Sequence, residues 1–374
     1  MRATADRAHP MTGTDTRRIW TTIVATGSYV PERQVPNSAF LERAFYSTDG
    51  RPIERSNQET INTFESITDI KERRYVTDDL NTSDIAYLAA RDALDSSGID
   101  PETLDYVIVA HNFGDVSVDN RRPDTVPTLA ARVKQRLGIE NPRTIAYDVA
   151  FGCAGWLQAV IQADYYIRSG DARRALVIGA ETLSRVSDPH DRDSMIYADG
   201  AGACVLQGVR SETPIGIMAH SSRSDANGHA DLLHMGPSNN PGFEGTDLFL
   251  KMQGHKLYEY ALRHVPRVVK DCVARAGLST RDISKVLLHQ ANAKMDEAIL
   301  ARFYQLFGED PPRMVMPMTI SWLGNSSVAT LPTLLDLLLK GKLASQRVMA
   351  GQNIVLAAVG AGMNINALAY HIPR

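Results

Sequence analysis

Apolar positions along the chain fall into two patterns, short continuous runs and longer stretches with helical spacing. The short runs predict buried strands at residues 20–25, 106–110, 144–148, 175–179, 203–207, 286–289 and 354–359. Apolar residues three and four positions apart predict helices at residues 82–97, 126–137, 156–168, 256–276, 294–307 and 328–340. Pro127 and Pro332 each fall in the first turn of a predicted helix, where the missing N–H is not needed. Strands that alternate with helices predict a layered α/β fold.

The two halves of the chain repeat one another weakly. Gly98, Leu104 and the apolar run that starts at Val107 recur 179 positions later as Gly277, Ile283 and the run that starts at Val286. A second repeat sets Gly152, Cys153 and the following helix against Gly324, Asn325 and the following helix. We therefore predict a duplicated unit in which Cys153 and Asn325 occupy equivalent strand–helix junctions that meet at one site. The predicted divisions are a disordered arm at residues 1–18, a first half at 19–212 and a second half at 213–374.

Composition and charge exclude several classes of function. The chain has 374 residues, of which 44% are hydrophobic and 22% charged, and its net charge is −3. This balance is typical of a globular enzyme and gives no field that would attract nucleic acid or an anionic membrane. Three scattered cysteines suit neither a disulfide framework nor a zinc cluster, and they favour a reducing cytoplasm. The apolar runs are too short to span a membrane, and the polar first eighteen residues do not resemble a signal peptide.

The segment at residues 147–156, YDVAFGCAGW, is the first candidate for chemistry. It predicts a strand that stops at Cys153 and turns at once into a helix, with glycine or alanine on both sides of the thiol. A helix N-terminus carries unpaired N–H groups and the positive end of the backbone dipole, so the position favours the nucleophilic thiolate. The alternative is a small buried residue that fills a tight junction.

His289 and Asn325 are the candidates to assist Cys153. His289 ends the predicted strand at 286–289, and Asn325 precedes the predicted helix at 328–340. Taken alone, a histidine in the position of His289 is more often a core residue than a catalyst, and Asn325 is explained equally well as a helix N-cap. Together with Cys153 they form a nucleophile and two hydrogen-bond donors, which suit stabilisation of an enolate or oxyanion.

The other polar clusters are weaker candidates for a functional site. The charged run at residues 188–193 indicates a solvated loop. The glycine-rich residues 199–203 precede a strand instead of opening a helix, so they do not match a dinucleotide-binding fingerprint. The spacing of His220, His229, Asp231 and His234 matches no established metal site, and we expect no metal and no cofactor.

These motifs, taken in order, resemble the thiolase superfamily, most closely β-ketoacyl-acyl-carrier-protein synthase III. The resemblance runs from about residue 21 to residue 370. The segments that carry it are residues 25–32, 70–74, 148–156, 179–182, 188–192, 199–203, 289–292, 324–327 and 360–362. The resemblance implies a duplicated, five-layered αβαβα fold.

The resemblance also implies a role for each site residue. Cys153 would take an acyl group from a coenzyme A or carrier-protein thioester. His289 and Asn325 would hold a malonyl or β-ketoacyl thioester on acyl carrier protein during decarboxylation, and the main-chain N–H groups of Cys153 and Ala361 would form the oxyanion hole. The enzyme would be a homodimer without a cofactor. The positions that match the pantetheine tunnel are Arg192, Gly254, Tyr258, Ala291 and Asn292, and Lys294 matches a residue that docks the acidic carrier protein.

Several positions depart from the family pattern. Thr63 and Ile67 stand where a tryptophan and an arginine grip coenzyme A, and Asp69 stands where glycine is usual. A carrier-protein acyl donor therefore becomes plausible. The loops at 42–60 and 112–126 look longer than usual, and in the family the second reaches the partner subunit. These changes suggest a synthase of secondary metabolism, of the kind that makes cyclohexanedione or dialkylresorcinol precursors.

Two other hypotheses stay open beside the condensing enzyme. The first is acyl transfer from Cys153 to an oxygen or nitrogen nucleophile without decarboxylation, against which the presence of both His289 and Asn325 argues. The second is a non-catalytic thiolase-like partner subunit, against which the presence of Cys153 argues.

Overall fold

Two mixed sheets lie face to face across a pair of buried helices. The computed structural model describes residues 17–373, so the predicted arm lies outside the described residues except for its last two positions. Of these, Arg18 already belongs to the first strand and not to the arm. The first sheet runs in the order β1-β7-β6-β4-β5, with β4 parallel to both β5 and β6 and the other pairs antiparallel. Its strands are β1 (Arg18–Tyr29), β4 (Tyr106–Ala110), β5 (Ile145–Val149), β6 (Arg174–Thr182) and β7 (Asp199–Ser211).

The second sheet repeats this pattern with one strand fewer. Its order is β11-β12-β13-β8, with β11 and β12 parallel and the other neighbours antiparallel. The predicted division between residues 212 and 213 lies in the link between the last strand of the first sheet and the first strand of the second. The strands of the second sheet are β8 (Gly216–Ser224), β11 (Ile283–Leu288), β12 (Asn353–Gly360) and β13 (Asn364–His371).

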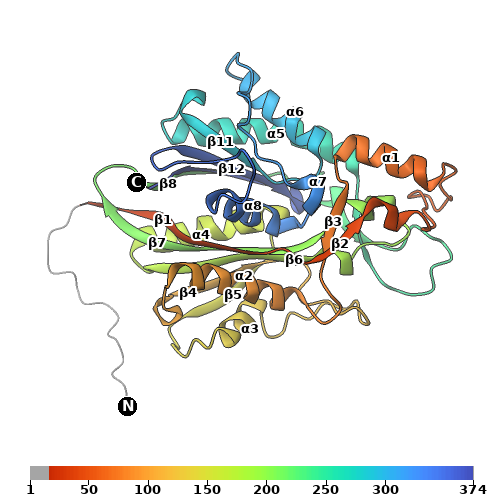
Figure 1. The fold of residues 1–374 in the computed structure, drawn as a ribbon, viewed down its shortest axis with the longest axis horizontal. Helices are drawn as coiled ribbons and strands as arrows, with labels where there is room; N and C mark the ends of the chain where they lie inside the picture. The colour runs from red at the N-terminus through yellow and green to blue at the C-terminus, as the bar shows by residue number, and fades with distance from the viewer. Residues whose placement is uncertain (1–16, 374) are drawn as a thin grey trace.

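The helices complete a stack of five layers, which Figure 1 shows from top to bottom. α4 (Gly155–Ser169) and α8 (Thr330–Leu339) form the middle layer, and their apolar residues join both sheets in one buried cluster. α2 (Thr82–Ser97) and α3 (Leu129–Arg136) cover the outer face of the first sheet. α5 (Gly254–Arg275) and α6 (Ala293–Gln305) cover the outer face of the second. The predicted five-layered αβαβα fold is therefore confirmed.

The internal repeat is visible in the backbone as well. Gly98 and Gly277 follow α2 and α5, and both have a positive φ, of 66° and 70°. Each is followed by a short 3₁₀ turn, Pro101–Thr103 in one half and Thr280–Asp282 in the other, and then by a parallel strand. The equivalent segments thus adopt the same order of helix, left-handed glycine, turn and strand.

The predicted helix and strand boundaries agree best with the structure where caps and apolar runs are both strong. The helix at 82–97 has the predicted bounds, because Asn81 and Asp84 form a capping box and Gly98 ends the helix in the left-handed conformation. The helix predicted at 126–137 begins only at Leu129, capped by Thr128, so the placement of Pro127 in its first turn is wrong. Pro332 does lie in the first turn of α8.

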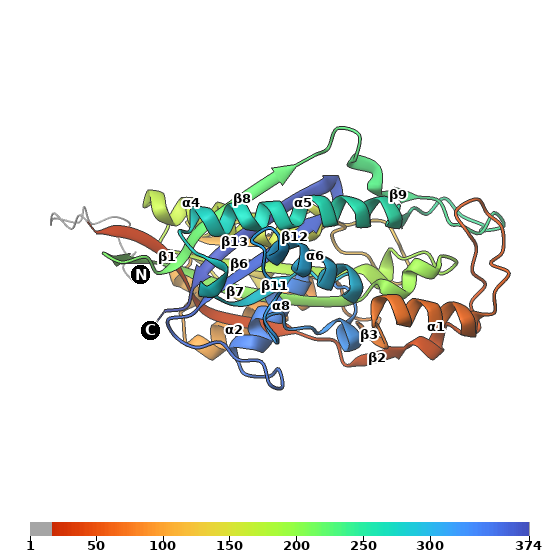
Figure 2. The same cartoon turned by 90° about the horizontal axis from the view of Figure 1, so that it is seen from above.

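A smaller group of elements gathers at the end of the molecule opposite both termini (Figure 2). Arg73 ties part of this group to the main body, since its fully buried guanidinium donates to the carbonyls of Val35 and Met195 and to the side chain of Asn37. The elements outside the five layers are β2 (Arg33–Pro36), α1 (Asn57–Thr68), β3 (Glu72–Tyr75), β9 (Leu233–Gly236), β10 (Phe249–Met252) and α7 (Ile320–Leu323).

None of the helices within residues 17–373 combines the length and the apolar character that crossing a bilayer requires.

Candidate active site

Cys153 lies in a 3₁₀ turn between β5 and α4, at the floor of a cavity. Gly152 precedes it with a φ of 60°, a conformation that favours glycine. A Cβ at Gly152 would lie 2.4 Å from the nitrogen of Ala361, and one at Gly360 would lie 2.3 Å from the nitrogen of Cys153. Two glycines therefore let the loop at 360–361 approach the backbone of the thiol closely.

Asn325 occupies the corresponding turn before α8, after Gly324 with a φ of 68°. Its backbone N–H donates to the carbonyl of Ile196 over 3.0 Å, and its carbonyl accepts from Ala198 over 2.8 Å. Its side-chain oxygen accepts the N–H of Ser327 over 2.8 Å. Because the amide oxygen is occupied, the amide NH₂ is the end of this side chain left to face a ligand.

His289 follows the last residue of β11 and is 6% exposed. Its backbone N–H donates to the carbonyl of Ala357 over 2.8 Å, which continues the pairing of β11 with β12. Burial lowers the pKa of the imidazole to about 4, so the ring is neutral at physiological pH. Nδ1 has no hydrogen-bond partner within residues 17–373. A neutral ring of this kind can donate one hydrogen bond to a ligand oxygen.

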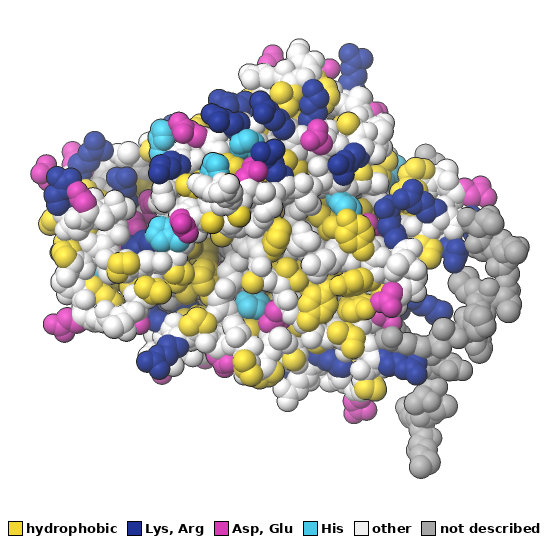
Figure 3. Space-filling model, turned by 180° about the vertical axis from the view of Figure 1, so that it is seen from behind, with side chains coloured by type: hydrophobic (Ala, Val, Ile, Leu, Met, Phe, Trp, Pro, Cys, Tyr) yellow, Lys and Arg dark blue, Asp and Glu magenta, His cyan; other side chains and the backbone are white. Residues whose placement is uncertain are grey.

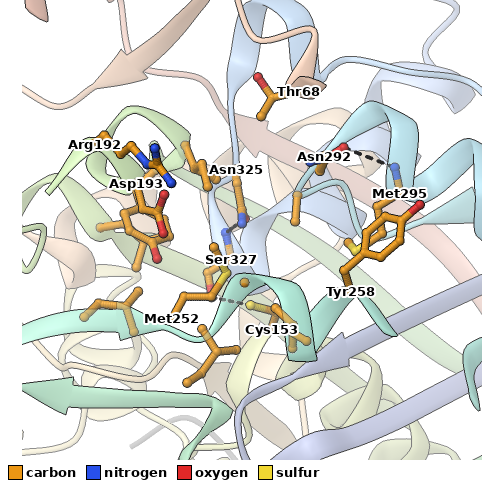
Figure 4. A pocket seen from close by; sticks show the side chains of 18 of the residues that line it. Thr68, Cys153, Arg192, Asp193, Met252, Tyr258, Asn292, Met295, Asn325 and Ser327 are labelled. Carbon is orange, nitrogen blue, oxygen red and sulfur yellow. Dashed lines mark hydrogen bonds between the residues drawn. The ribbon is translucent and has the colours of Figure 1, made fainter. Parts of the chain in front are cut away.

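Cys153, His289 and Asn325 line one cavity of about 660 Å³. The cavity reaches the surface beside α1, where Tyr258 is 37% exposed. In Figure 4, Arg192 lies on one side of this space and Tyr258 and Asn292 lie on the other. Lys294 lines a separate surface pocket next to the cavity. The predicted residues that line the main cavity are Cys153, Arg192, Gly254, Tyr258, His289, Ala291, Asn292, Asn325 and Ala361.

The thiol of Cys153 is less acidic than the sequence predicts. Burial raises its pKa to about 11, although a hydrogen bond from Ser327 acts in the opposite direction. The prediction that the helix start favours the thiolate is therefore wrong, because burial penalises the charged form of the sulfur. The thiol has to lose its proton during the reaction itself.

A polar chain behind Cys153 was not predicted from the sequence. The Ser327 hydroxyl donates to the Cys153 sulfur over 3.4 Å, the contact dashed in Figure 4. Asn112 donates to the Ser327 hydroxyl over 3.2 Å and to Glu181 over 2.6 Å. Burial raises the pKa of Glu181 to about 7, and the nearby charge of His111 opposes this shift. These residues lie far apart in the chain, so the sequence carries no local signal for them.

Two carboxylates of the charged run at 188–193, those of Asp188 and Asp191, are buried and paired, which corrects the prediction of a solvated loop. Lys251 on β10 donates to Asp188 over 2.5 Å and to Asp191 over 3.2 Å. Asp188 is 1% exposed and also accepts the backbone N–H of Asn239. A lysine about sixty residues away thus neutralises the carboxylates, and the segment forms part of the cavity wall.

Two of the departures from the family pattern line the cavity, and the third lies beside it. Thr63 and Ile67, on α1, both line it, so no tryptophan or arginine side chain projects from these positions. Asp69 ends α1 with a φ of 58°, a conformation in which glycine is the easier residue. The mouth therefore has a different surface from the one that the resemblance implies.

The side chains considered for a metal site come from two separate segments of the second half. His220 is on β8, whereas His229 and His234 flank the 3₁₀ turn at Ala230–Leu232. Within residues 17–373, no three His, Cys, Asp or Glu side chains are placed to hold a metal ion together.

Known proteins resemble the chain over most of its length. The family model for 3-oxoacyl-[acyl-carrier-protein (ACP)] synthase III matches residues 147–226, and the model for its C-terminal part matches residues 273–372. A β-ketoacyl-[acyl-carrier-protein] synthase III of Cereibacter sphaeroides is 34% identical over 90% of this chain and 94% of its own length. The synthase III structure of Thermus thermophilus has a TM-score of 0.77 and 30% identity, and covers 93% of this chain and 98% of its own. The priming β-ketosynthase of the R1128 polyketide pathway has a TM-score of 0.78 and 26% identity, with coverage of 96% and 97%.

Proposed function

The chain belongs to the 3-oxoacyl-[acyl-carrier-protein] synthase III family, and from this premise we propose how its site residues divide the reaction. The protein is a C–C bond-forming acyltransferase that condenses an acyl thioester with malonyl-acyl-carrier protein, with loss of carbon dioxide, in fatty-acid or polyketide synthesis. The observation that carries the residue assignment is that Cys153, His289 and Asn325 come from separate segments and line one cavity.

In the first step the Cys153 sulfur attacks the carbonyl of the acyl thioester. The thiol proton ends on the departing carrier thiol, so the step creates no net charge in the buried site. The tetrahedral oxyanion is held by the backbone N–H groups of Cys153 and Ala361, whose nitrogens the glycines at 152 and 360 bring close together. A donor of this kind typically lowers the free-energy barrier by about 3–4 kcal/mol.

In the second step a malonyl thioester occupies the site beside the acyl-Cys153. The neutral His289 ring and the amide NH₂ of Asn325 donate to its thioester oxygen. Carbon dioxide leaves, and the electron pair of the broken bond becomes the enolate that these two donors stabilise. The enolate carbon then attacks the acyl carbon, the bond to the Cys153 sulfur breaks, and a β-ketoacyl thioester is released. No cofactor enters either step.

We infer that a carrier protein, not coenzyme A, supplies the acyl group. The mouth carries Thr63 and Ile67, which offer neither an aromatic face nor a cation to a nucleotide. Lys294 is exposed at the start of α6, close to the mouth, and is our candidate for docking the acidic carrier protein. Lys294→Glu should raise the KM for malonyl-carrier protein several-fold and leave acylation by a small thioester unchanged. The cyclohexanedione or dialkylresorcinol subgroup stays a prediction.

We further propose a homodimer that works in the cytoplasm. β5 is an outer strand of its sheet, and Ile145 on it is 48% exposed. In the loop that follows β4, Val118 is 54% and Val126 is 84% exposed. Figure 3 shows apolar side chains gathered across the middle of one face. Open sheet edges and large apolar patches are typical of subunit interfaces. Light scattering should give twice the chain mass, and Ile145→Lys should shift it toward the monomer. Free Cys153, Cys204 and Cys272 favour a reducing compartment.

The deciding experiment reads the intact mass of the protein after incubation with acyl-carrier protein and acyl-coenzyme A, and again after malonyl-carrier protein is added. We expect an acyl adduct that Cys153→Ala abolishes and that Cys272→Ala, at a buried cysteine outside the cavity, retains. Malonyl-carrier protein should discharge the adduct into a β-ketoacyl product. An adduct that persists in Cys153→Ala contradicts the mechanism, and one that malonyl-carrier protein never discharges indicates acyl transfer to another nucleophile.

A further inference from the structure

Two polar side chains on the wall of the main cavity have no partner. Tyr197 is 4% exposed, and its hydroxyl makes no hydrogen bond within residues 17–373. The carboxyl of Asp193 likewise has no hydrogen-bond or ion-pair partner in this part of the chain, although its backbone N–H donates to Asp191. Figure 4 shows Asp193 beside Arg192, across the cavity from Tyr258. The apolar residues that line the cavity with them include Leu183, Ile196, Leu250 and Met252.

The protonation states make these two groups complementary to one another. Burial, and after it the charges of Asp193, Asp191 and Cys153, raises the pKa of Tyr197 well above its usual value, so the phenol keeps its proton. Burial and the charge of Asp191 raise the pKa of Asp193 to about 6, so it is mainly a carboxylate at neutral pH. The wall therefore presents one donor and one acceptor, which come from the 3₁₀ turn at Arg192–Ile196 and from its C-cap. Leaving the buried Tyr197 hydroxyl unpaired in an apolar cavity is unfavourable, and a ligand that pairs with it removes this penalty.

We propose that Asp193 and Tyr197 form a hydroxyl-binding subsite, and that the acyl group carried by Cys153 bears a hydroxyl group close to its thioester carbon. This inference rests on the proposed function. A hydroxyl group accepts from the phenol and donates to the carboxylate at once. A ketone pairs only with Tyr197, and an alkyl chain pairs with neither. The hydroxyl lies near the thioester because Tyr197 forms a β-bridge with Asn325, and both residues line the cavity together with Cys153. A few placed polar groups in an apolar pocket are the usual means of ligand selection.

The test compares acyl groups on one and the same carrier arm. The full-length protein is acylated with octanoyl, 3-oxooctanoyl and 3-, 4- or 5-hydroxyoctanoyl thioesters of pantetheine, and the rate of the Cys153 adduct is read by intact mass. We expect at least one hydroxyoctanoyl thioester to exceed octanoyl about tenfold in kcat/KM. Tyr197→Phe and Asp193→Asn should each bring that ratio close to one. Tyr304→Phe is the matched control, because its hydroxyl is also buried and unpartnered but lies in α6, outside the cavity.

The possible outcomes separate this inference from the proposed function. If octanoyl acylates Cys153 and no hydroxyoctanoyl thioester is preferred, the subsite is wrong and the condensing mechanism stands. A preference for the 3-oxo thioester also overturns it. Equal losses for every thioester in Tyr197→Phe would place the subsite on the pantetheine arm, which contradicts the proposal. Absence of any adduct on the wild-type protein would instead contradict the proposed function.

Discussion

The junctions that carry Cys153 and Asn325 have a similar backbone conformation, but their surroundings differ. In each, a glycine with a φ of 60° to 68° leads into a 3₁₀ turn and then into a helix of the middle layer. The first junction follows β5, a complete strand, whereas residues 314–319 before the second form no strand. There the buried side chain of Gln290 donates to Pro317 and accepts the N–H of Thr319. A side chain therefore replaces part of a missing strand, directly beside His289.

The second junction also contains a strained residue that reaches the first. Ser327 has a φ of 55°, which is uncommon for a residue with a side chain and costs of order 1–3 kcal/mol. In that conformation its N–H holds the Asn325 side chain and its hydroxyl contacts the Cys153 sulfur. The duplication placed two equivalent turns at one cavity, and this divergence couples them. Mutations at the two junctions should consequently affect different steps of the reaction.

The largest expected effect distinguishes the two junctions by the reaction step that each one serves. Asn325→Ala removes one of the two donors to the malonyl thioester, so condensation should fall about 10²- to 10³-fold. The acyl adduct on Cys153 should still form, because that step uses the first junction. Intact mass and product formation report the two steps separately. Asn353→Ala, at the start of β12, serves as control. Equal losses in both steps would contradict the division of roles.

Gly152→Ala should nearly abolish acylation, with a loss of at least a hundredfold. The new Cβ would lie 2.4 Å from the Ala361 nitrogen and would separate the two backbone N–H groups of the oxyanion hole. Gly98→Ala is the matched control, because Gly98 has a similar φ of 66° but open space around the added carbon. It should cost only about 1 kcal/mol of stability. Urea unfolding and adduct formation should be measured for both variants, and similar activity in the two would argue against the close approach.

The parts of the molecule that could be predicted are those governed by local rules. α2 combines a capping box, helical apolar spacing and a terminal glycine, and its bounds were predicted to the residue. α1 was missed because its sequence is mostly polar and buries few side chains. β13 was missed because Asn364 and Asn366 interrupt its apolar pattern, although Asn366 is fully buried. Polar residues that are satisfied by distant partners therefore hide a strand from sequence analysis.

The site residues divide in the same way, into those that the nearby sequence marks and those whose roles depend on contacts with distant residues. Cys153 and Asn325 were found because a repeated glycine marks each turn, and His289 because it ends an apolar run. Ser327 and Glu181 were not found, because their roles depend on contacts between residues that lie far apart in the chain. The charged run at 188–193 was misjudged for this reason too, since Lys251 lies in another element. Burial of Cys153, which reverses the predicted direction of its pKa, is likewise a property of the assembled layers.

Ser327 allows the coupling between the junctions to be measured. Ser327→Ala and Ser327→Gly both remove the hydroxyl that lowers the pKa of Cys153, so both should slow acylation about tenfold. They should differ in stability, because glycine relieves the strained φ of 55° and alanine does not. We expect the free energy of unfolding, measured in urea, to be about 1 kcal/mol higher for Ser327→Gly than for Ser327→Ala. If only the alanine variant loses activity, the backbone and not the hydroxyl is responsible.

The smallest expected effect on the reactivity of the site concerns Glu181, whose charge acts on Cys153. Its pKa in the folded protein is raised to about 7 from an ordinary 4.5, so the protonated form is favoured. The stability that it contributes is complete below about pH 4.5 and is lost as the pH rises through 7. Glu181→Gln should remove this loss, worth up to a few kcal/mol because one pKa unit corresponds to about 1.4 kcal/mol. Urea unfolding at pH 5 and pH 8 measures it.

The same variant should make the Cys153 thiol more reactive. The negative charge of Glu181 contributes to the raised pKa of Cys153, so its removal should increase the fraction of thiolate at a given pH. Iodoacetamide should then alkylate Cys153 several-fold faster at pH 8, where Glu181 is ionised in the wild type, and at a similar rate at pH 5.5. Glu140→Gln, at an exposed position outside the cavity, is the control. An equal acceleration at both pH values would mean that the substitution loosens the packing around Cys153. An effect confined to high pH would show that the buried charge of Glu181 makes the first junction differ from the second.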